Sequence, residues 1–291
     1  MRAIALVTLL AAAAASGCGG ASGYGSGGSA TQAPGPGAAG VVALSISSGS
    51  FKGPSSVKGG LLTLQLTNTG SAPHSAQLIR LEGGHTIAQA VAALSAQTTA
   101  TPDWLRAEGG VGLVRPSARA SATMLLAPGA YAVLDLTGAQ EHQIGSPVVM
   151  PLTVTAGAAA SLPGAATTIT AVAPGPARYR WQISGPLKVG ANAVRFVSEG
   201  ASAVHELTAV RLPGSRYAGQ FVKALEGTGP PPSFVDRTTT QQTAVLDGGK
   251  SLLTTLTFTR PGTYVFFCHL SDRSGGRPHF AEGLLSTVVV R

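Results

Sequence analysis

The sequence has little of what would build a disulfide scaffold or a helical bundle. Its 291 residues include two cysteines, and aromatic residues make up only 5% of the chain. Two cysteines cannot supply the dense cross-links of a small disulfide-stabilised fold. No long segment has the 3.6-residue periodicity of an amphipathic helix. Short alternating apolar runs lie between glycines and prolines instead, and this pattern predicts an all-β fold.

Charge of either sign is also scarce. Charged residues make up 11% of the chain, with 20 Lys and Arg against 12 Asp and Glu, for a net charge of +8. The arginines are scattered and are not interleaved with aromatic residues, so no nucleic-acid partner is expected. Such spread charge is typical of a solvated surface, and docking to an acidic partner or to anionic lipid is the lesser alternative.

No apolar run is long enough to span a bilayer. The longest, residues 4–15, follows Arg2 and leads into Ala-Ser-Gly-Cys at 15–18, which resembles a bacterial lipobox. We therefore predict a signal peptide over 1–18 and lipidation of Cys18. The protein would then be exported and held by its lipid at the outer face of the cytoplasmic membrane or in the periplasm. Ordinary cleavage after the alanines at 13–15 is the alternative.

Residues 19–40 are rich in Gly, Ser and Pro and predict a flexible tether with a reach of roughly 25 Å. If Cys18 carries lipid, Cys268 has no disulfide partner. An unpaired thiol in an exported protein is a liability unless it is packed away or bound to something. Cys268 is thus the residue that most needs an explanation.

The two halves of the chain resemble each other. Residues 57–84 are similar to 187–215, and residues 127–136 are similar to 260–269. The order is the same and the offset is nearly constant, which indicates an internal repeat. Each repeat contains many short strands and one short helical stretch, at 87–94 and at 218–225. We predict two tandem β-sandwiches, over 41–157 and 167–291, with a linker at 158–166.

The second repeat carries the ligands of a type 1 copper site. Such a site takes a thiolate, two imidazoles and a weak or absent axial ligand. His205 lies on a predicted strand, Cys268 ends another, and His279 follows in the next loop. Each residue alone has a plainer explanation, as a buried apolar thiol or a hydrogen-bonded core histidine. The three together, in this order, favour copper.

These residues carry a family resemblance. His-Glu-Leu at 205–207, PGTYVFFC ending at Cys268, and PHFAEGL at 278–284 resemble the plastocyanin-like cupredoxins. The resemblance implies Greek-key β-sandwiches and one copper ion bound by His205, Cys268 and His279. It also places Leu284 at the axial position where the family usually has methionine. Leucine cannot coordinate, and the loss of a donor destabilises Cu(II) relative to Cu(I), so a raised reduction potential is expected. The loop between Cys268 and His279 is longer than in compact plastocyanins.

The first repeat keeps one of these ligands. His74 corresponds to His205, but Asp135 stands where the thiolate would be and Met150 where Leu284 is. Without a thiolate a blue copper site is lost, so we expect a domain without copper. A weak second metal site, formed by the following residues, is the lesser alternative: His74, Asp135, His142 and Met150.

The number of histidines speaks against a multicopper oxidase. The chain has six histidines, whereas the trinuclear cluster of a multicopper oxidase takes eight by resemblance. No motif of another enzyme class is present, and a copper nitrite reductase is only a remote alternative. We predict a non-catalytic, membrane-tethered electron carrier that exchanges electrons with a redox partner protein. A copper buffer or chaperone and a metal-free interaction module are the alternatives.

His269, next to the thiolate on a strand, is expected to face outward, away from the metal.

Overall fold

The computed structural model describes residues 39–291 except 48, 97–99, 138–146, 176 and 228–229. The predicted signal peptide, Cys18, most of the tether and His142 lie outside the described residues. Among the described helices, none is both long enough and apolar enough to cross a membrane.

The first half of the chain has nine strands and one helix in the described residues. They are β1 (Gly40–Ser47), β2 (Ser50–Lys52), β3 (Ser56–Lys58), β4 (Gly60–Asn68), β5 (His74–Leu81), α1 (Ile87–Ser95), β6 (Leu105–Val114), β7 (Arg119–Leu126), β8 (Gly129–Asp135) and β9 (Val148–Thr155).

The second half has ten strands, one α-helix and two 3-10 helices in its described residues. They are β10 (Thr167–Gly175), β11 (Arg178–Ser184), β12 (Gly190–Ser198), β13 (Val204–His205), β14 (Thr208–Leu212), η1 (Ser215–Tyr217), α2 (Ala218–Glu226), β15 (Asp236–Gln242), β16 (Leu246–Asp247), β17 (Ser251–Phe258), β18 (Gly262–Phe267), η2 (His279–Glu282) and β19 (Leu285–Val290).

Both halves are β-sandwiches with the same strand order. One sheet runs β2-β1-β4-β7 in the first half and β11-β10-β12-β17 in the second. The facing sheet runs β6-β5-β8-β9 in the first half and β15-β14-β18-β19 in the second. Even the parallel pairs β1–β4 and β10–β12 correspond. The prediction of an all-β fold with two sandwiches is confirmed.

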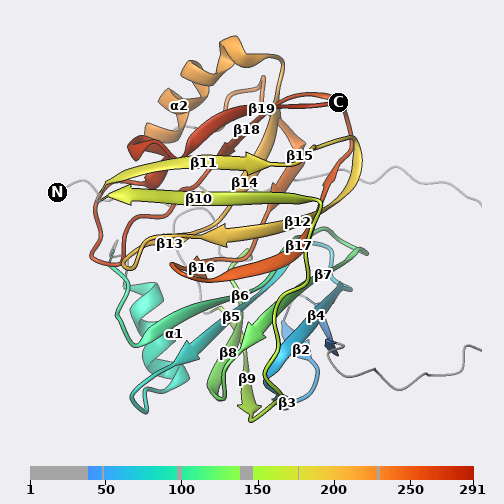
Figure 1. Ribbon diagram of the computed structural model, residues 1–291, viewed down its shortest axis with the longest axis vertical. Coiled ribbons are helices and arrows are strands. Elements are labelled where there is room, and N and C mark those ends of the chain that lie inside the picture. Colours follow the sequence, from blue (N-terminus) through green and yellow to red (C-terminus); the bar gives the residue numbers. More distant parts are fainter. Residues whose placement is uncertain (1–38, 48, 97–99, 138–146, 176, 228–229) are drawn as a thin grey trace, which may run out of the picture.

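The two sandwiches are joined edge to edge. Strand β7 pairs antiparallel with β17 through Met124 and Leu252, and this closes one continuous eight-stranded sheet across both halves (Figure 1). Strand β6 pairs with β16 between Glu108 and Leu246. Met124, Leu246 and Leu252 belong to one core cluster that contains residues of both halves. The two sandwiches therefore form one packed body, because burying these apolar side chains together removes their surface from water.

Local sequence explains the elements that build this body. Along β4, Leu62, Leu64 and Leu66 alternate with half-buried residues and point into the core. The capping box of Thr86 and Gln89 starts α1. Each helix covers the outer face of the second sheet of its own half, α1 on β5 and β8, and α2 on β14 and β18. The predicted helical stretches are thus confirmed. Strands β5 and β18 are largely buried on both faces, and they hold His74 and Cys268 at their ends in fixed positions.

Candidate metal centre

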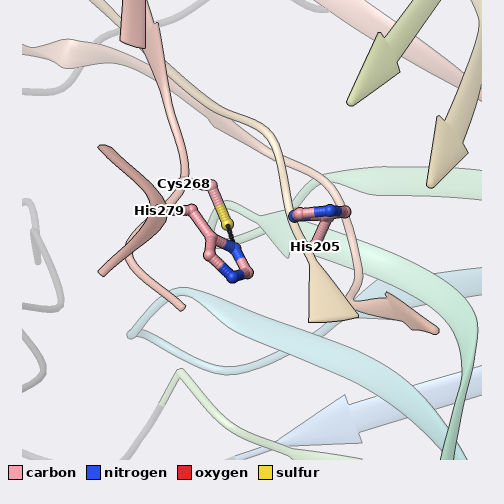
Figure 2. A group of neighbouring side chains, drawn as sticks. All are labelled: His205, Cys268 and His279. Atoms are coloured by element: carbon pink, nitrogen blue, oxygen red, sulfur yellow. Dashed lines mark hydrogen bonds between the residues drawn. The ribbon is translucent and has the colours of Figure 1, made fainter. Parts of the chain in front are cut away.

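Three side chains from distant parts of the chain meet inside the second sandwich. His205 ends β13, Cys268 directly follows β18, and His279 begins η2 (Figure 2). All three residues are fully buried. One ligand atom from each, two imidazole nitrogens and the sulfur, all lie within 4.8 Å of one another. The structure therefore brings together the three residues that the sequence singled out.

Backbone hydrogen bonds fold the ligand loop back on itself. The Cys268 N–H donates to the Leu284 carbonyl at 3.2 Å, and the Phe280 N–H donates to the Cys268 carbonyl at 2.9 Å. The Leu284 N–H in turn donates to the His279 carbonyl at 2.8 Å. Gly283 ends η2 at φ 109°, and a Cβ there would lie 2.2 Å from the Tyr179 carbonyl oxygen. Only glycine fits that position, so the loop closes tightly under β11.

The two nitrogens of each imidazole have different surroundings. His205 Nε2 lies 3.2 Å from the Glu199 carbonyl oxygen and donates to it, which leaves Nδ1 as the nitrogen with the free lone pair. That Nδ1 is buried and has no hydrogen-bond partner. His279 Nδ1 lies 3.7 Å from Cys268 Sγ, the contact dashed in Figure 2, while its Nε2 lies 3.4 Å from Asp272 Oδ1. A buried polar atom without a partner is costly, and a metal ion at this point would satisfy it.

Burial sets the protonation of all three groups. It lowers the pKa of His205 to about 3, helped by the neighbouring His279, and it lowers the pKa of His279 to about 4. Both imidazoles are then neutral at pH 7 and can offer a lone pair. Burial raises the pKa of the Cys268 thiol, and the charge of Glu206 adds to this. The thiol therefore keeps its proton until a metal displaces it. The Glu206 N–H lies 3.5 Å from the sulfur and can donate to it.

Tyr179 and Asp272, which no sequence pattern singled out, lie next to the imidazoles. The Tyr179 ring centroid on β11 lies 4.3 Å from that of His279 and 5.1 Å from that of His205. Its hydroxyl donates to Asp272 Oδ1 at 2.5 Å. Tyr179 alternates with exposed Arg178 and Arg180, which marks it as an inward residue. Nothing in the sequence indicates that β11 crosses over the ligands, because that contact is tertiary.

Leu284 and His269 lie close to the ligands in the chain and differ in their surroundings. Leu284 is fully buried in the same core cluster as Cys268. His269 was expected to face outward, but its side chain is only 11% exposed. It lines a cavity of about 100 Å³ between the two sandwiches, and its Nδ1 lies 3.6 Å from Glu206 Oε1. The strand alternation puts His269 on the side away from the thiol, but the first sandwich covers that side.

The corresponding position in the first sandwich holds a hydrogen-bonded histidine and aspartate. His74 Nδ1 lies 2.6 Å from Asp135 Oδ2, and both residues are buried. Asp135 Oδ1 also accepts hydrogen bonds from the backbone N–H and hydroxyl groups of Ser75 and Thr137. Met150 lies opposite Val133 in the β8–β9 ladder. In the part of the chain that the structure describes, the group in the second sandwich is the only set of three metal-type ligands.

The chain is similar to several solved copper proteins, but the TM-scores of these matches are low. No family model and no curated protein matches the chain. A reduced auracyanin from Roseiflexus castenholzii is 28% identical, with a TM-score of 0.30, over 44% of this chain and 99% of that one. A blue copper oxidase from Nitrosomonas europaea is 15% identical, with a TM-score of 0.25, over 85% of this chain and 84% of that one. A copper-containing nitrite reductase from Thermus scotoductus is 12% identical, with a TM-score of 0.24, over 86% of this chain and 61% of that one. At such scores the assignment of a metal rests on this chain's own side chains.

Proposed function

We propose that this protein is a type 1 copper electron carrier with one copper ion bound by His205, Cys268 and His279. The observation that carries the proposal is the convergence of a buried thiol and two neutral imidazoles within 4.8 Å. Thiolate sulfur is a soft donor that favours copper, and two imidazoles with one thiolate form the trigonal set of blue copper sites. A catalytic zinc site would keep an open position for water. All three ligand residues are fully buried, which speaks against that alternative.

The depth of the site favours electron transfer over copper delivery. Tyr179 and Asp272 lie over His279, so an ion would have to displace them to leave. An electron needs no such opening, and the cover is thin: Tyr179 is 7% exposed, and the Asp272 side chain is 19% exposed. A resident ion that exchanges electrons with a partner protein fits this arrangement better than a copper buffer does. It also fits a carrier better than an enzyme, because the buried ligands leave no room for a substrate at the metal.

Leu284 is proposed to occupy the axial side of the copper. Its carbonyl accepts from the Cys268 N–H and its own N–H donates to the His279 carbonyl, so it is tied to two of the ligands. Its side chain is fully buried and offers only hydrocarbon. A three-coordinate site without an axial donor favours Cu(I), which raises the reduction potential.

Titration of the metal-free protein with Cu(II) tests this function. We expect an intense visible band from thiolate-to-copper charge transfer, with an end point at one equivalent, because one thiol converges with two imidazoles. Cys268→Ser is expected to remain colourless. His85→Gln is the matched control, since His85 stacks on Trp104 outside the ligand group, and it should keep the full band. A colourless wild-type protein that binds Cu(I) tightly would indicate copper handling, and no binding of either ion would overturn the proposal.

We also propose that a lipid on Cys18 tethers the carrier to a membrane, supported by the apolar run at 4–15 and the Ala-Ser-Gly-Cys motif. Cell fractionation of the wild type and Cys18→Ser checks this. The wild type is expected in the membrane fraction, and the variant should lose the thiol that accepts the lipid and leave that fraction. An unchanged distribution would count against the tether. Cys268→Ser, the other cysteine variant, serves as the control and should stay with the membrane.

A further inference from the structure

Arg273 ties the ligand loop of the second sandwich to the first sandwich. It lies between Cys268 and His279 in the chain and is 5% exposed. Its guanidinium donates to the carbonyl oxygens of Pro102 and Leu105, each at 2.9 Å. Its own carbonyl accepts from the Thr101 N–H at 2.7 Å. The loop between Cys268 and His279, which is longer than in compact plastocyanins, is thus bonded to the segment that leads into β6.

The same guanidinium connects the loop to β16, the strand that pairs with the strand of the first histidine ligand. Arg273 Nη2 donates to the buried carboxylate of Asp247 on β16. Strand β16 pairs with β13, with Asp247 opposite Val204 and Leu246 opposite His205. Asp247 also accepts from the Ala107 N–H of the first sandwich at 3.2 Å. One buried ion pair therefore joins the ligand loop, the His205 strand and the first sandwich.

Asp272, the residue before Arg273, lies next to the metal centre. The Asp272 carboxylate accepts from the Tyr179 hydroxyl and lies 3.4 Å from His279 Nε2. Because consecutive residues share a rigid peptide unit, fixing Arg273 restricts where Asp272 can be. Ligands are held in place by the groups that contact their outer atoms, and loss of those groups loosens the site.

We propose that the first sandwich positions the copper-ligand loop through Arg273. The first sandwich is then part of the metal centre's framework, in addition to being a domain without copper. Arg273 is a positioning residue: it contacts no ligand atom and acts through the loop and through Asp272. The copper readouts rest on the proposed function, whereas the geometric role of Arg273 does not.

A metal-free measurement tests the positioning directly. In a Cys18→Ser background Cys268 is the only thiol, and its burial keeps it slow toward a thiol reagent. Arg273→Ala is expected to raise the rate of Cys268 modification at least tenfold, because the loop loses its attachment. Arg273→Lys retains a cation at this position and should recover part of the protection. Asp247→Asn, which keeps the guanidinium and its two carbonyl contacts, is expected to give a smaller increase and serves if Arg273→Ala does not fold.

Arg115→Ala is the matched control. Arg115 also reaches across the two sandwiches, donating to the carbonyls of Thr238 and Thr240 at 2.7 and 3.1 Å, but it contacts β15 and not the ligand loop. It should leave Cys268 as slow as in the parent protein. Equal rates in Arg273→Ala and its parent, or equal acceleration in Arg273→Ala and Arg115→Ala, would overturn the proposal.

With copper bound, the same variants report on the site itself. Arg273→Ala is expected to shift the charge-transfer band and the reduction potential and to slow electron self-exchange at least threefold, since a looser loop rearranges more between Cu(II) and Cu(I). Arg115→Ala should change none of these. If the wild type shows no copper band while the thiol rates still separate the two variants, the copper function fails and the positioning role stands. A copper-loaded Arg273→Ala with the wild-type spectrum, potential and self-exchange rate would refute the link to the metal.

Discussion

Replacing Asp135 with alanine is expected to destabilise the protein by about 3–5 kcal/mol, although Asp135 lies in the sandwich without the proposed copper site. Its carboxylate is buried and bonds to His74, Ser75 and Thr137. Removing it leaves several buried donors without an acceptor, and each unpaired donor costs about 1–3 kcal/mol. Urea unfolding of the metal-free protein, followed by tryptophan fluorescence, measures the change.

Asp103→Ala is the control for this substitution, because Asp103 is an exposed acidic residue of the same half. Its effect should stay within about 0.5 kcal/mol. A loss below 1 kcal/mol in Asp135→Ala, on the order of one ordinary hydrogen bond, would show that the His74–Asp135 network does not hold the first sandwich together.

The corresponding histidines of the two sandwiches, His74 and His205, have different surroundings. In the first, His74 Nδ1 bonds to a carboxylate of the chain itself, while its Nε2 is buried without a partner. In the second, His205 Nδ1 is buried without a partner, beside a thiol and another imidazole. At the same fold position, one histidine is therefore hydrogen-bonded to a carboxylate, and the other lies beside a thiol and a second imidazole. The neighbouring side chains separate the structural histidine from the proposed ligand.

Leu284→Met is expected to lower the reduction potential of the copper-loaded protein by about 60 mV or more. A thioether on the axial side would donate to copper and stabilise Cu(II) over Cu(I). A tenfold change in that preference corresponds to about 59 mV for one electron. Leucine and methionine have similar volumes, so the exchange should cost less than about 1.5 kcal/mol of stability. Potentiometric titration followed at the charge-transfer band measures the shift.

Leu207→Met is the matched control for the axial position. Leu207 is equally buried, belongs to the same core cluster and lies two residues after His205. Its substitution should leave the potential within a few millivolts of the wild type, since its backbone is tied to Thr243 and not to a ligand residue. Equal potentials for Leu284→Met and the wild type would remove Leu284 from the axial side.

Much of the fold follows from local patterns in the sequence. Alternating leucines such as Leu62 and Leu64 specify strands with one buried face, and the capping residues at Thr86 start a helix. The similarity between the halves anticipates the repeated strand order. The order and spacing of His205, Cys268 and His279 indicate a joint role. These properties depend on short-range periodicity or on residue chemistry, both of which can be read along the chain.

Tertiary structure alone decided how the two sandwiches meet and what surrounds the ligands. The pairing of β7 with β17 depends on which edges can share an apolar core, and no local pattern specifies it. The same holds for Tyr179 over the imidazoles and for His269, which alternation turns away from the thiol and the first sandwich then covers. Arg273 reads in sequence as one more loop arginine. Its role depends on carbonyls about 170 residues away, because a buried cation is stable only where folding gathers enough acceptors around it.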